Sequence, residues 1–260
     1  MKICVINYMK ICVIKLLMKR KINGFTLIEL SIVIVIIGLI VAGVVGGQAL
    51  VRQAKARSLI TDFNKYELAL NNFRLEYNNA IPGDFAKAQD YWGVGVTNGD
   101  GDGVIEFWPP ATNFEDTHIW NHLSQAELIA GTYSGGISGS RFEYGINVPT
   151  GPFSNSAFAI NTNVNPTYGK IRTILTIASI APNNPMQGFQ NRSVIDVRIA
   201  KGIDDKADDG EASTGKYLTF RGNEVVGTNV CVTDIWTAPS ADWLLTDTTI
   251  SCRIAYDVTR

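Results

Sequence analysis

The sequence predicts an α+β protein in which a long N-terminal helix, apolar in its first half, packs on a small antiparallel sheet accompanied by short helices. Three observations support this: an unbroken apolar run, an apolar stripe that continues it at helical spacing, and short alternating segments between loops rich in Gly and Pro. The chain has 260 residues, of which 46% are hydrophobic. This is enough for one membrane helix and one globular domain.

The first element is the apolar run Phe25–Leu50. A helix needs roughly 20 consecutive apolar residues to cross the hydrocarbon core of a bilayer, and this run is long enough. Between Lys21 and Arg52 the only ionisable side chain is Glu29. A carboxylate inside a membrane segment is costly and usually functional, whereas a signal peptide or a plain anchor gains nothing from it. The run therefore predicts a membrane helix with a specific use for Glu29.

A basic leader ending in Gly24 precedes this run, which begins with the order Phe25–Glu29 (FTLIE). The arrangement closely resembles the class III signal of type IV pilins and type II secretion pseudopilins, and the resemblance extends from residue 19 to about 77. It implies that a prepilin peptidase cleaves after Gly24 and methylates the new amino group of Phe25. It also implies that Glu29 pairs with the Phe25 amine of a neighbouring subunit during assembly.

Residues 1–24 are thus expected to be the leader. The motif MKICVI occurs at Met1 and again at Met9, and a start at Met18 would give the shorter leader usual in the family. Residues 1–17 are therefore either part of a long leader or are not made at all, because the start codon was assigned too early. The leader holds six of the 23 basic residues and none of the 24 acidic ones. The chain after Gly24 therefore contains 17 basic and 24 acidic residues, and its net charge is near −7. The basic flank predicts a cytoplasmic leader and an exported C-terminal domain. Net acidity argues against nucleic-acid binding.

The helix is expected to continue past its transmembrane and assembly half, residues 25–51, into an amphipathic half, residues 52–78. Apolar side chains recur there at spacings of three and four: Leu59, Phe63, Tyr66, Leu70, Phe73 and Tyr77. A coiled coil is the alternative, but the stripe lasts only about three heptads. A turn signal at Pro82-Gly83 ends the helix, and residues 79–260 are expected to form the exported head.

A loop rich in Gly and Asp, residues 98–106, is the most informative stretch of the head. Asn98, Asp100 and Asp102 alternate as oxygen donors, and Glu106 stands at the ninth position of a loop that resembles the first half of an EF-hand or dockerin Ca²⁺ loop. The glutamate usual at position 12 is missing. These four side chains are the predicted ligands of a structural Ca²⁺, and a simple turn is the alternative.

Three short helices are expected in the head, at residues 84–92, 116–129 and 193–206. His118 and His122 lie one turn apart, a spacing that can hold Zn²⁺, but surface or half-buried imidazoles without a metal are favoured. The acidic residues at 204–211 admit a second cation site, and a solvated helix end with a turn is favoured instead.

Five strands are expected, at residues 141–146, 157–161, 171–179, 217–221 and 230–232. Two tryptophans near the C-terminus, Trp236 and Trp243, are expected to be exposed and to belong to a packing or partner surface.

Four cysteines are present, and two of them precede Gly24. The remaining pair, Cys231 and Cys252, lies in the exported domain and predicts a disulfide, which agrees with the C-terminal bridge found in many pilins. Two free thiols are the alternative.

Motifs of the common catalytic sites are absent, including GxSxG, the P-loop and HExxH, so an enzyme is not expected. The sequence predicts a structural subunit of a type IV pilus or a type II secretion pseudopilus. Its expected partners are copies of itself, other pilin-like subunits, prepilin peptidase and the inner-membrane assembly platform. We expect it in the bacterial inner membrane before assembly and in a periplasmic or cell-surface filament afterwards. The alternative is a membrane-tethered exported binding module or enzyme whose anchor resembles a pilin helix.

Overall fold

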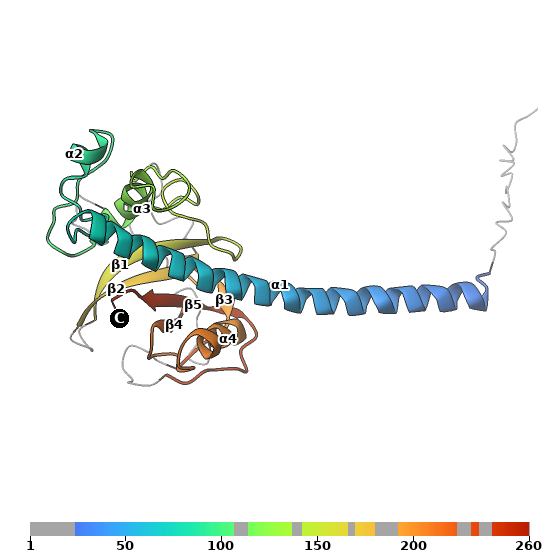
Figure 1. Cartoon of the computed structure of the whole chain (residues 1–260). Coiled ribbons are helices and arrows are strands. Elements are labelled where there is room, and N and C mark those ends of the chain that lie inside the picture. The colour runs from blue at the N-terminus through green and yellow to red at the C-terminus, as the bar shows by residue number, and fades with distance from the viewer. Residues whose placement is uncertain are drawn as a thin grey trace, which may run out of the picture. The chain divides into compact units, whose positions relative to one another are not determined.

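The computed structural model describes residues 24–106, 114–136, 142–165, 170–179, 192–222, 230–233 and 241–259. The expectations for the leader before Gly24, for the first residue of the strand expected at 141–146 and for Trp236 lie outside these residues. The chain divides into two compact units, residues 1–48 and residues 49–260. The N-terminal helix α1, Leu27–Glu76, contributes to both units (Figure 1).

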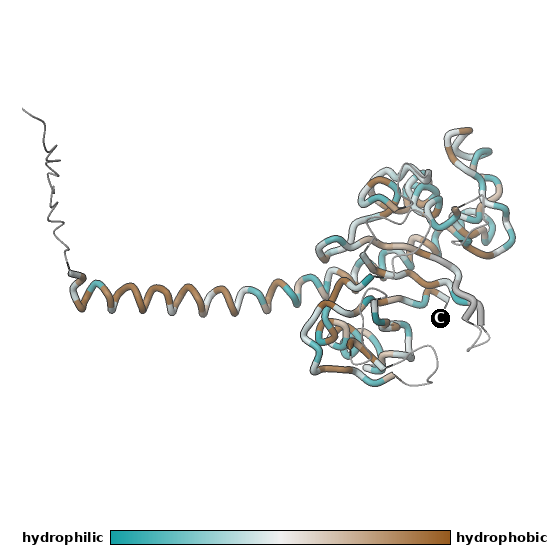
Figure 2. The backbone as a smooth tube through the Cα atoms, turned by 180° about the vertical axis from the view of Figure 1, so that it is seen from behind, coloured by the Kyte–Doolittle hydropathy of each residue, from teal (hydrophilic) through white to brown (hydrophobic). Residues whose placement is uncertain are grey.

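The first half of α1 is mostly apolar, as the hydropathy colouring of Figure 2 shows, and its large apolar side chains are exposed. It contains a window long and apolar enough to cross a membrane, and none of that window is buried within the chain. Exposed Ile, Leu and Val side chains are stable in lipid or against other helices, and not in water. The structure therefore agrees with a membrane segment here, by length and composition.

The second half of α1 buries the predicted stripe. All six of its members are buried: Leu59, Phe63, Tyr66, Leu70, Phe73 and Tyr77. Phe63 lies at the centre of the core. Its ring stacks on that of Tyr256 with centroids 5.3 Å apart and meets Phe158 and Tyr217 edge-on, each at 5.8 Å. The stripe is thus the face of α1 that packs on the sheet, and a coiled coil is not needed to explain it.

Five strands form one antiparallel sheet in the order β1-β2-β5-β3, with β4 also paired to β5. The strands are β1 Ser156–Asn165, β2 Lys170–Ser179, β3 Ile195–Asp196, β4 Tyr217–Arg221 and β5 Ile250–Asp257. The expected α+β class, with a long helix on a small antiparallel sheet, is confirmed.

Two predicted strands are wrong within the described residues. No strand forms over 142–146: Tyr144 makes only an isolated bridge to Val148, and the N–H of Gly145 closes a turn by donating to Val148 O at 2.8 Å. Gly145 has φ +71°, which suits a turn and not a strand. Near the disulfide, Val232 likewise forms only an isolated bridge, to Trp243.

The three short helices exist with different bounds: α2 Ala88–Trp92, α3 Glu115–Gln125 and α4 Val197–Ala207. In α3 the backbone of Glu127 at φ +58° ends the helix earlier than expected. Before α4, Ile195 and Asp196 pair with β5 as β3, and the Asp196 carboxylate then caps the helix. Its Oδ1 accepts the N–H groups of Arg198 and Ile199, both at 3.0 Å, so the helix begins after Asp196 and not at 193.

Candidate functional site

The acidic loop brings together three of the four predicted Ca²⁺ ligands. Carboxylate oxygens of Asp100, Asp102 and Glu106 lie within 4.8 Å of one another. The fourth, Asn98, uses its Oδ1 to accept the backbone N–H of Gln89 in α2, at 2.8 Å. The loop is shaped by its own aspartates, because Asp102 Oδ1 accepts the N–H of Val104 at 2.7 Å.

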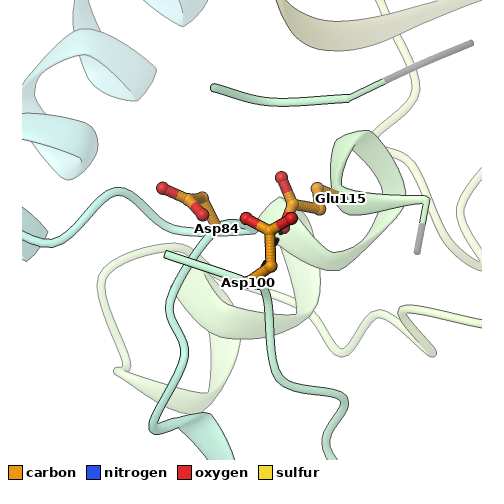
Figure 3. A group of neighbouring side chains, drawn as sticks. All are labelled: Asp84, Asp100 and Glu115. Atoms are coloured by element: carbon orange, nitrogen blue, oxygen red, sulfur yellow. Dashed lines mark hydrogen bonds between the residues drawn. The ribbon is translucent and has the colours of Figure 1, made fainter. Parts of the chain in front are cut away.

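Two further acids, absent from the sequence prediction, complete this cluster. Asp84, just before α2, and Glu115, the first residue of α3, place carboxylate oxygens within 4.8 Å of Asp100 (Figure 3). Asp84 is almost fully buried and accepts the N–H groups of Gly101 at 2.6 Å and Gly103 at 2.8 Å. The helix expected from residue 84 begins only at Ala88, after Lys87 with its non-helical φ of −115°.

Burial and mutual repulsion raise the pKa values of two carboxyl groups in the acidic cluster. Burial raises the pKa of Asp84 to about 6, assisted by the charges of Asp102 and Asp100 and opposed by the N–H groups of the loop. Burial also raises the pKa of Glu115 to about 9, and a hydrogen bond with the Glu106 carboxyl adds to this effect. Protonation of Glu115 relieves part of this repulsion near neutral pH.

At the start of α1, Thr26 and Glu29 form reciprocal hydrogen bonds. The backbone N–H and the hydroxyl of Thr26 both donate to Glu29 Oε2, at 2.8 and 2.7 Å, and the N–H of Glu29 donates to Thr26 Oγ1 at 3.3 Å. This is a capping box, which satisfies N–H groups that have no partner within the helix. The sequence analysis found the acid but not this role.

Phe25 immediately precedes the capping box and is 84% exposed, and the large apolar side chains that follow it in α1 are exposed as well. Residues 19–45 match the family model described as the prokaryotic N-terminal methylation motif. The chain carries a class III prepilin signal. No curated protein and no solved structure matches the chain in the corresponding comparisons.

The prepilin signal supports a type IV pilin-like exported subunit, anchored in a membrane by its apolar helix. The match ends at residue 45 and does not include the head, whose candidate sites are therefore described from the structure alone. That geometry contains the predicted disulfide and two further groups of ionisable residues.

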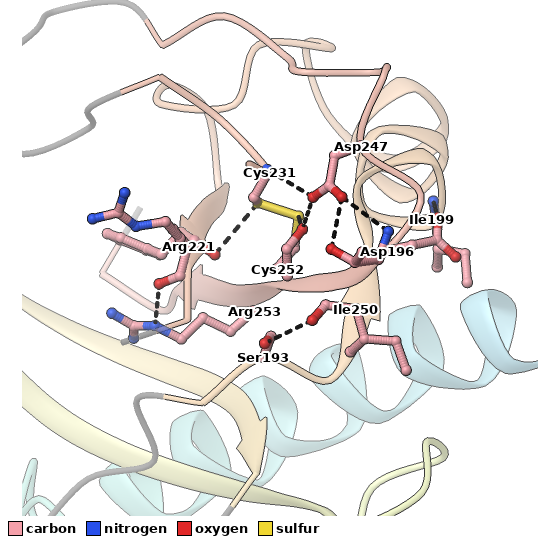
Figure 4. The surroundings of a disulfide bond; sticks show 12 residues. Ser193, Asp196, Ile199, Arg221, Cys231, Asp247, Ile250, Cys252 and Arg253 are labelled. Carbon is pink, nitrogen blue, oxygen red and sulfur yellow. Dashed lines mark hydrogen bonds between the residues drawn. A yellow bond between two sulfur atoms is a disulfide. The ribbon is translucent and has the colours of Figure 1, made fainter. Parts of the chain in front are cut away.

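The disulfide between Cys231 and Cys252 is present, with the two Cα atoms 5.3 Å apart (Figure 4). Asp247 organises its surroundings: one carboxylate oxygen accepts the N–H of Cys231 at 3.2 Å and the hydroxyl of Ser251, and the other accepts the N–H of Thr249 at 2.9 Å. Burial raises the pKa of Asp247, but the hydrogen bonds from Ser251 and Thr249 outweigh it and lower that pKa to about 2. Asp247 is therefore a charged acceptor that holds the bridge in place.

The two histidines are buried, not at the surface or half-buried as expected. His122 Nδ1 accepts the N–H of Gly83 at 2.9 Å, so its Nε2, 2.8 Å from Thr97 O, is the donor. Both ring nitrogens of His122 are thus occupied, one by the segment before α2 and the other by the segment after it. This argues against a zinc site on this pair. Burial lowers the pKa of both imidazoles to about 4.

The acids that follow α4 form a compact group, since oxygens of Asp204, Asp208 and Asp209 lie within 4.8 Å of one another. Most of their oxygens organise the turn into β4: Asp204 Oδ1 accepts the N–H of Gly210 at 2.7 Å, and Asp208 Oδ2 accepts that of Tyr217 at 2.7 Å. These bonds agree with the helix end and turn that the sequence favoured. Asp204 is buried, however, so this turn is not fully solvated.

Trp243 is partly buried and uses its indole N–H to donate to Gly210 O at 2.9 Å. Its role in the described structure is packing beside the turn after α4.

Proposed function

We propose that the protein is a filament subunit of the type IV pilus or type II secretion pseudopilus class. In this proposal prepilin peptidase cleaves after Gly24, Phe25 becomes the methylated N-terminus, and assembly bundles the apolar halves of α1 from many copies. The observation that supports it most is the match of the prepilin signal to residues 19–45, at the start of an exposed apolar helix.

Glu29 has a physical reason to act in assembly. Among the described residues its carboxylate accepts hydrogen bonds from Thr26 alone. When apolar helices bundle, a carboxylate among them is tolerated if an ammonium group neutralises it, and the amine of Phe25 on a neighbouring subunit is such a group. The pairing favours one axial register between neighbours.

The test is intact-mass and N-terminal peptide mass spectrometry of the protein from native membranes and from sheared filaments. A chain that begins at methylated Phe25 and is enriched in sheared filaments is the expected result. A chain that keeps its leader and occurs only in membranes would contradict it and favour a tethered binding module or enzyme. Enrichment at the cell surface distinguishes a pilus from a periplasmic pseudopilus.

We also propose that the acidic cluster binds Ca²⁺ as a structural ion, with Asp100, Asp102 and Glu106 as ligands together with Asp84 and Glu115. Ca²⁺ prefers six to eight oxygen ligands, and carboxylates on three separate segments supply several of them here. The ion would replace the proton that otherwise neutralises Glu115, and it would join the segment before α2 to the start of α3.

Thermal unfolding of the full chain in detergent, with Ca²⁺ or with a chelator, tests this site. A saturating concentration, about 100 times the dissociation constant, is expected to stabilise the head by about 2.7 kcal/mol. Asp100→Asn with Glu106→Gln should abolish the increase, whereas Glu127→Gln, at an exposed position, should retain it. An unfolding temperature that does not respond to Ca²⁺ in the unsubstituted protein would rule the site out.

A further inference from the structure

A cavity of about 410 Å³ lies between the second half of α1 and α4, within the head unit. Its walls carry three cationic side chains, one from α1 and two from α4, together with an amide, a hydroxyl and a glycine: Arg52, Arg198, Lys206, Gln53, Thr248 and Gly202. We call this cavity the basic pocket. Its size is within the range of small-ligand sites.

The described residues on the walls of the basic pocket carry more positive than negative charge. Asp196 is the one acid on its walls, so three cations share the pocket with a single carboxylate, which also accepts the N–H groups that begin α4. None of the three cations forms an ion pair with a described residue. The pocket therefore favours an anion.

Two of the three cations lie on the same face of α4. On α4, Arg198, Gly202 and Lys206 follow each other at intervals of four residues, so they form a stripe along one face of the helix. Gly202 has no side chain, and a Cβ placed there would have no atom within 4 Å. The middle of the stripe is consequently open, with Arg52 contributed from α1.

The position of Arg52 along α1 indicates where the anion comes from. The exposed apolar side chains of the membrane segment continue to Val51, and Arg52 is the next residue. Residues directly after a membrane segment lie at the level of the lipid headgroups, where basic side chains interact with anionic lipids. This step rests on the membrane anchoring in the proposed function.

We propose that the basic pocket binds the phosphate of an anionic phospholipid headgroup, such as that of phosphatidylglycerol, on the outer side of the membrane. The planar guanidinium groups of Arg52 and Arg198 donate paired hydrogen bonds to phosphate oxygens, and Lys206 adds a point charge. A free phosphate compound shares this chemistry, so the test has to separate the two sources. A bound lipid would hold the base of the head at the membrane surface before assembly.

The test places the full chain in nanodiscs that contain equal amounts of phosphatidylglycerol and phosphatidylcholine and counts retained lipids by native mass spectrometry. Retention of phosphatidylglycerol is expected to exceed that of phosphatidylcholine about tenfold. Each of Arg52→Gln, Arg198→Gln and Lys206→Gln should weaken this preference about fivefold. The matched controls Arg57→Gln and Lys87→Gln remove the same charges from exposed positions outside the pocket and should change nothing.

A second pair of variants keeps the inference testable if charge removal disturbs the head. Gly202→Glu and Gly202→Gln add side chains of similar size into open space and should stabilise the helix by removing a glycine. Gly202→Glu should abolish the preference, because it adds a negative charge, whereas Gly202→Gln should reduce it less. Equal effects of the two would contradict a phosphate site.

Two further outcomes would overturn the inference. Equal retention of the two lipids by an inserted protein would exclude a headgroup site while leaving the filament proposal intact. Binding of glycerol 3-phosphate by the detergent-solubilised chain as strongly as of the lipid would assign the pocket to a soluble phosphate compound. Failure of the chain to insert at all would instead contradict the proposed function.

Discussion

The hydroxyl of Tyr256 on β5 donates a hydrogen bond of 2.7 Å to the Glu67 carboxylate on α1. The second oxygen of that carboxylate accepts from Lys216, beside β4, at 2.8 Å. Glu67 therefore ties the helix to two neighbouring parts of the head, next to the apolar stripe. Burial and the Glu67 carboxylate together raise the pKa of Tyr256, so the phenol remains a donor at physiological pH.

Two substitutions of Glu67 distinguish the contribution of its charge to stability from that of its hydrogen bond with Tyr256. Glu67→Ala leaves the buried Tyr256 hydroxyl without its acceptor and should destabilise the head by about 1–3 kcal/mol. Glu67→Gln keeps an acceptor and loses only a partly exposed ion pair, so it should cost less than about 1 kcal/mol. Urea unfolding of the full chain measures both, with Glu76→Gln as an exposed control on the same helix. Equal losses for the two Glu67 variants would show that the charge dominates.

The two roles of Glu29, capping α1 and pairing with a neighbour, predict different effects for two substitutions. Glu29→Gln retains an oxygen that can accept from Thr26, so the helix start should remain intact, but it removes the charge. Its incorporation into sheared filaments should fall about tenfold or more, because the neighbouring amine then has no counter-charge. Glu29→Ala should show the same loss and also a frayed helix start.

Cleavage after Gly24 is expected to be largely unchanged in both Glu29 variants, which N-terminal mass spectrometry checks. Filament yield is measured by immunoblotting of the sheared fraction. A normal yield for Glu29→Gln would mean that the carboxylate acts only as a helix cap.

The Cys231–Cys252 bridge joins residues 21 positions apart. A loop of this size is expected to contribute about 3 kcal/mol by restricting the unfolded chain. The Cys231→Ser, Cys252→Ser double variant should lose that amount in denaturant unfolding, and a reductant should produce the same loss in the unsubstituted protein. Reduction that breaks the bridge without lowering stability would contradict the prediction.

Asp204 predicts a pH dependence of stability. Burial raises its pKa from 3.8 to about 7, with contributions from the charges of Asp208 and Asp209. The folded chain therefore holds a proton that the unfolded chain releases near pH 3.8, so this acid destabilises the fold increasingly as pH rises to about 7. Asp204→Asn removes the effect, and the variant should gain about 2–4 kcal/mol over the original protein between pH 4 and pH 7.

The difference between Asp204→Asn and the original protein is the quantity to measure, because His118 and His122 act in the opposite direction. Their lowered pKa values mean that stability falls as pH drops from about 6.5 towards 4. The histidine effect is common to both proteins and cancels in the difference. A difference that stays constant across this pH range would contradict the titration of Asp204.

The long helix and its packing face were predictable because their signals are local and periodic. The stripe from Leu59 to Tyr77 required only a count of spacings, and every member is buried. By contrast, the segment 142–146 contains aromatic and aliphatic residues that suit a strand, but the turn at Gly145 decides its conformation. His118 and His122 were placed in a partly exposed position because their burial depends on neighbours distant in the sequence.

The acidic cluster shows where sequence reasoning stops. Asp100, Asp102 and Glu106 were predictable because they lie within one loop, at the spacing of a cation-binding motif. Asp84 and Glu115 join them from other segments, 16 and 15 residues from Asp100, and no periodicity connects those positions. The basic pocket was unpredicted for the same reason, since Arg52 and Arg198 are separated by most of the head.

By itself the sequence determined that this chain has a prepilin signal, an apolar helix long enough for a membrane and a continuous face for packing on a head. Each of these depends on the order and spacing of residues along one segment. Only the tertiary structure decided which acids share a cluster, which imidazoles are buried, and which cations line one cavity. Those properties depend on distances between segments, and the sheet and the core packing against α1 set these distances.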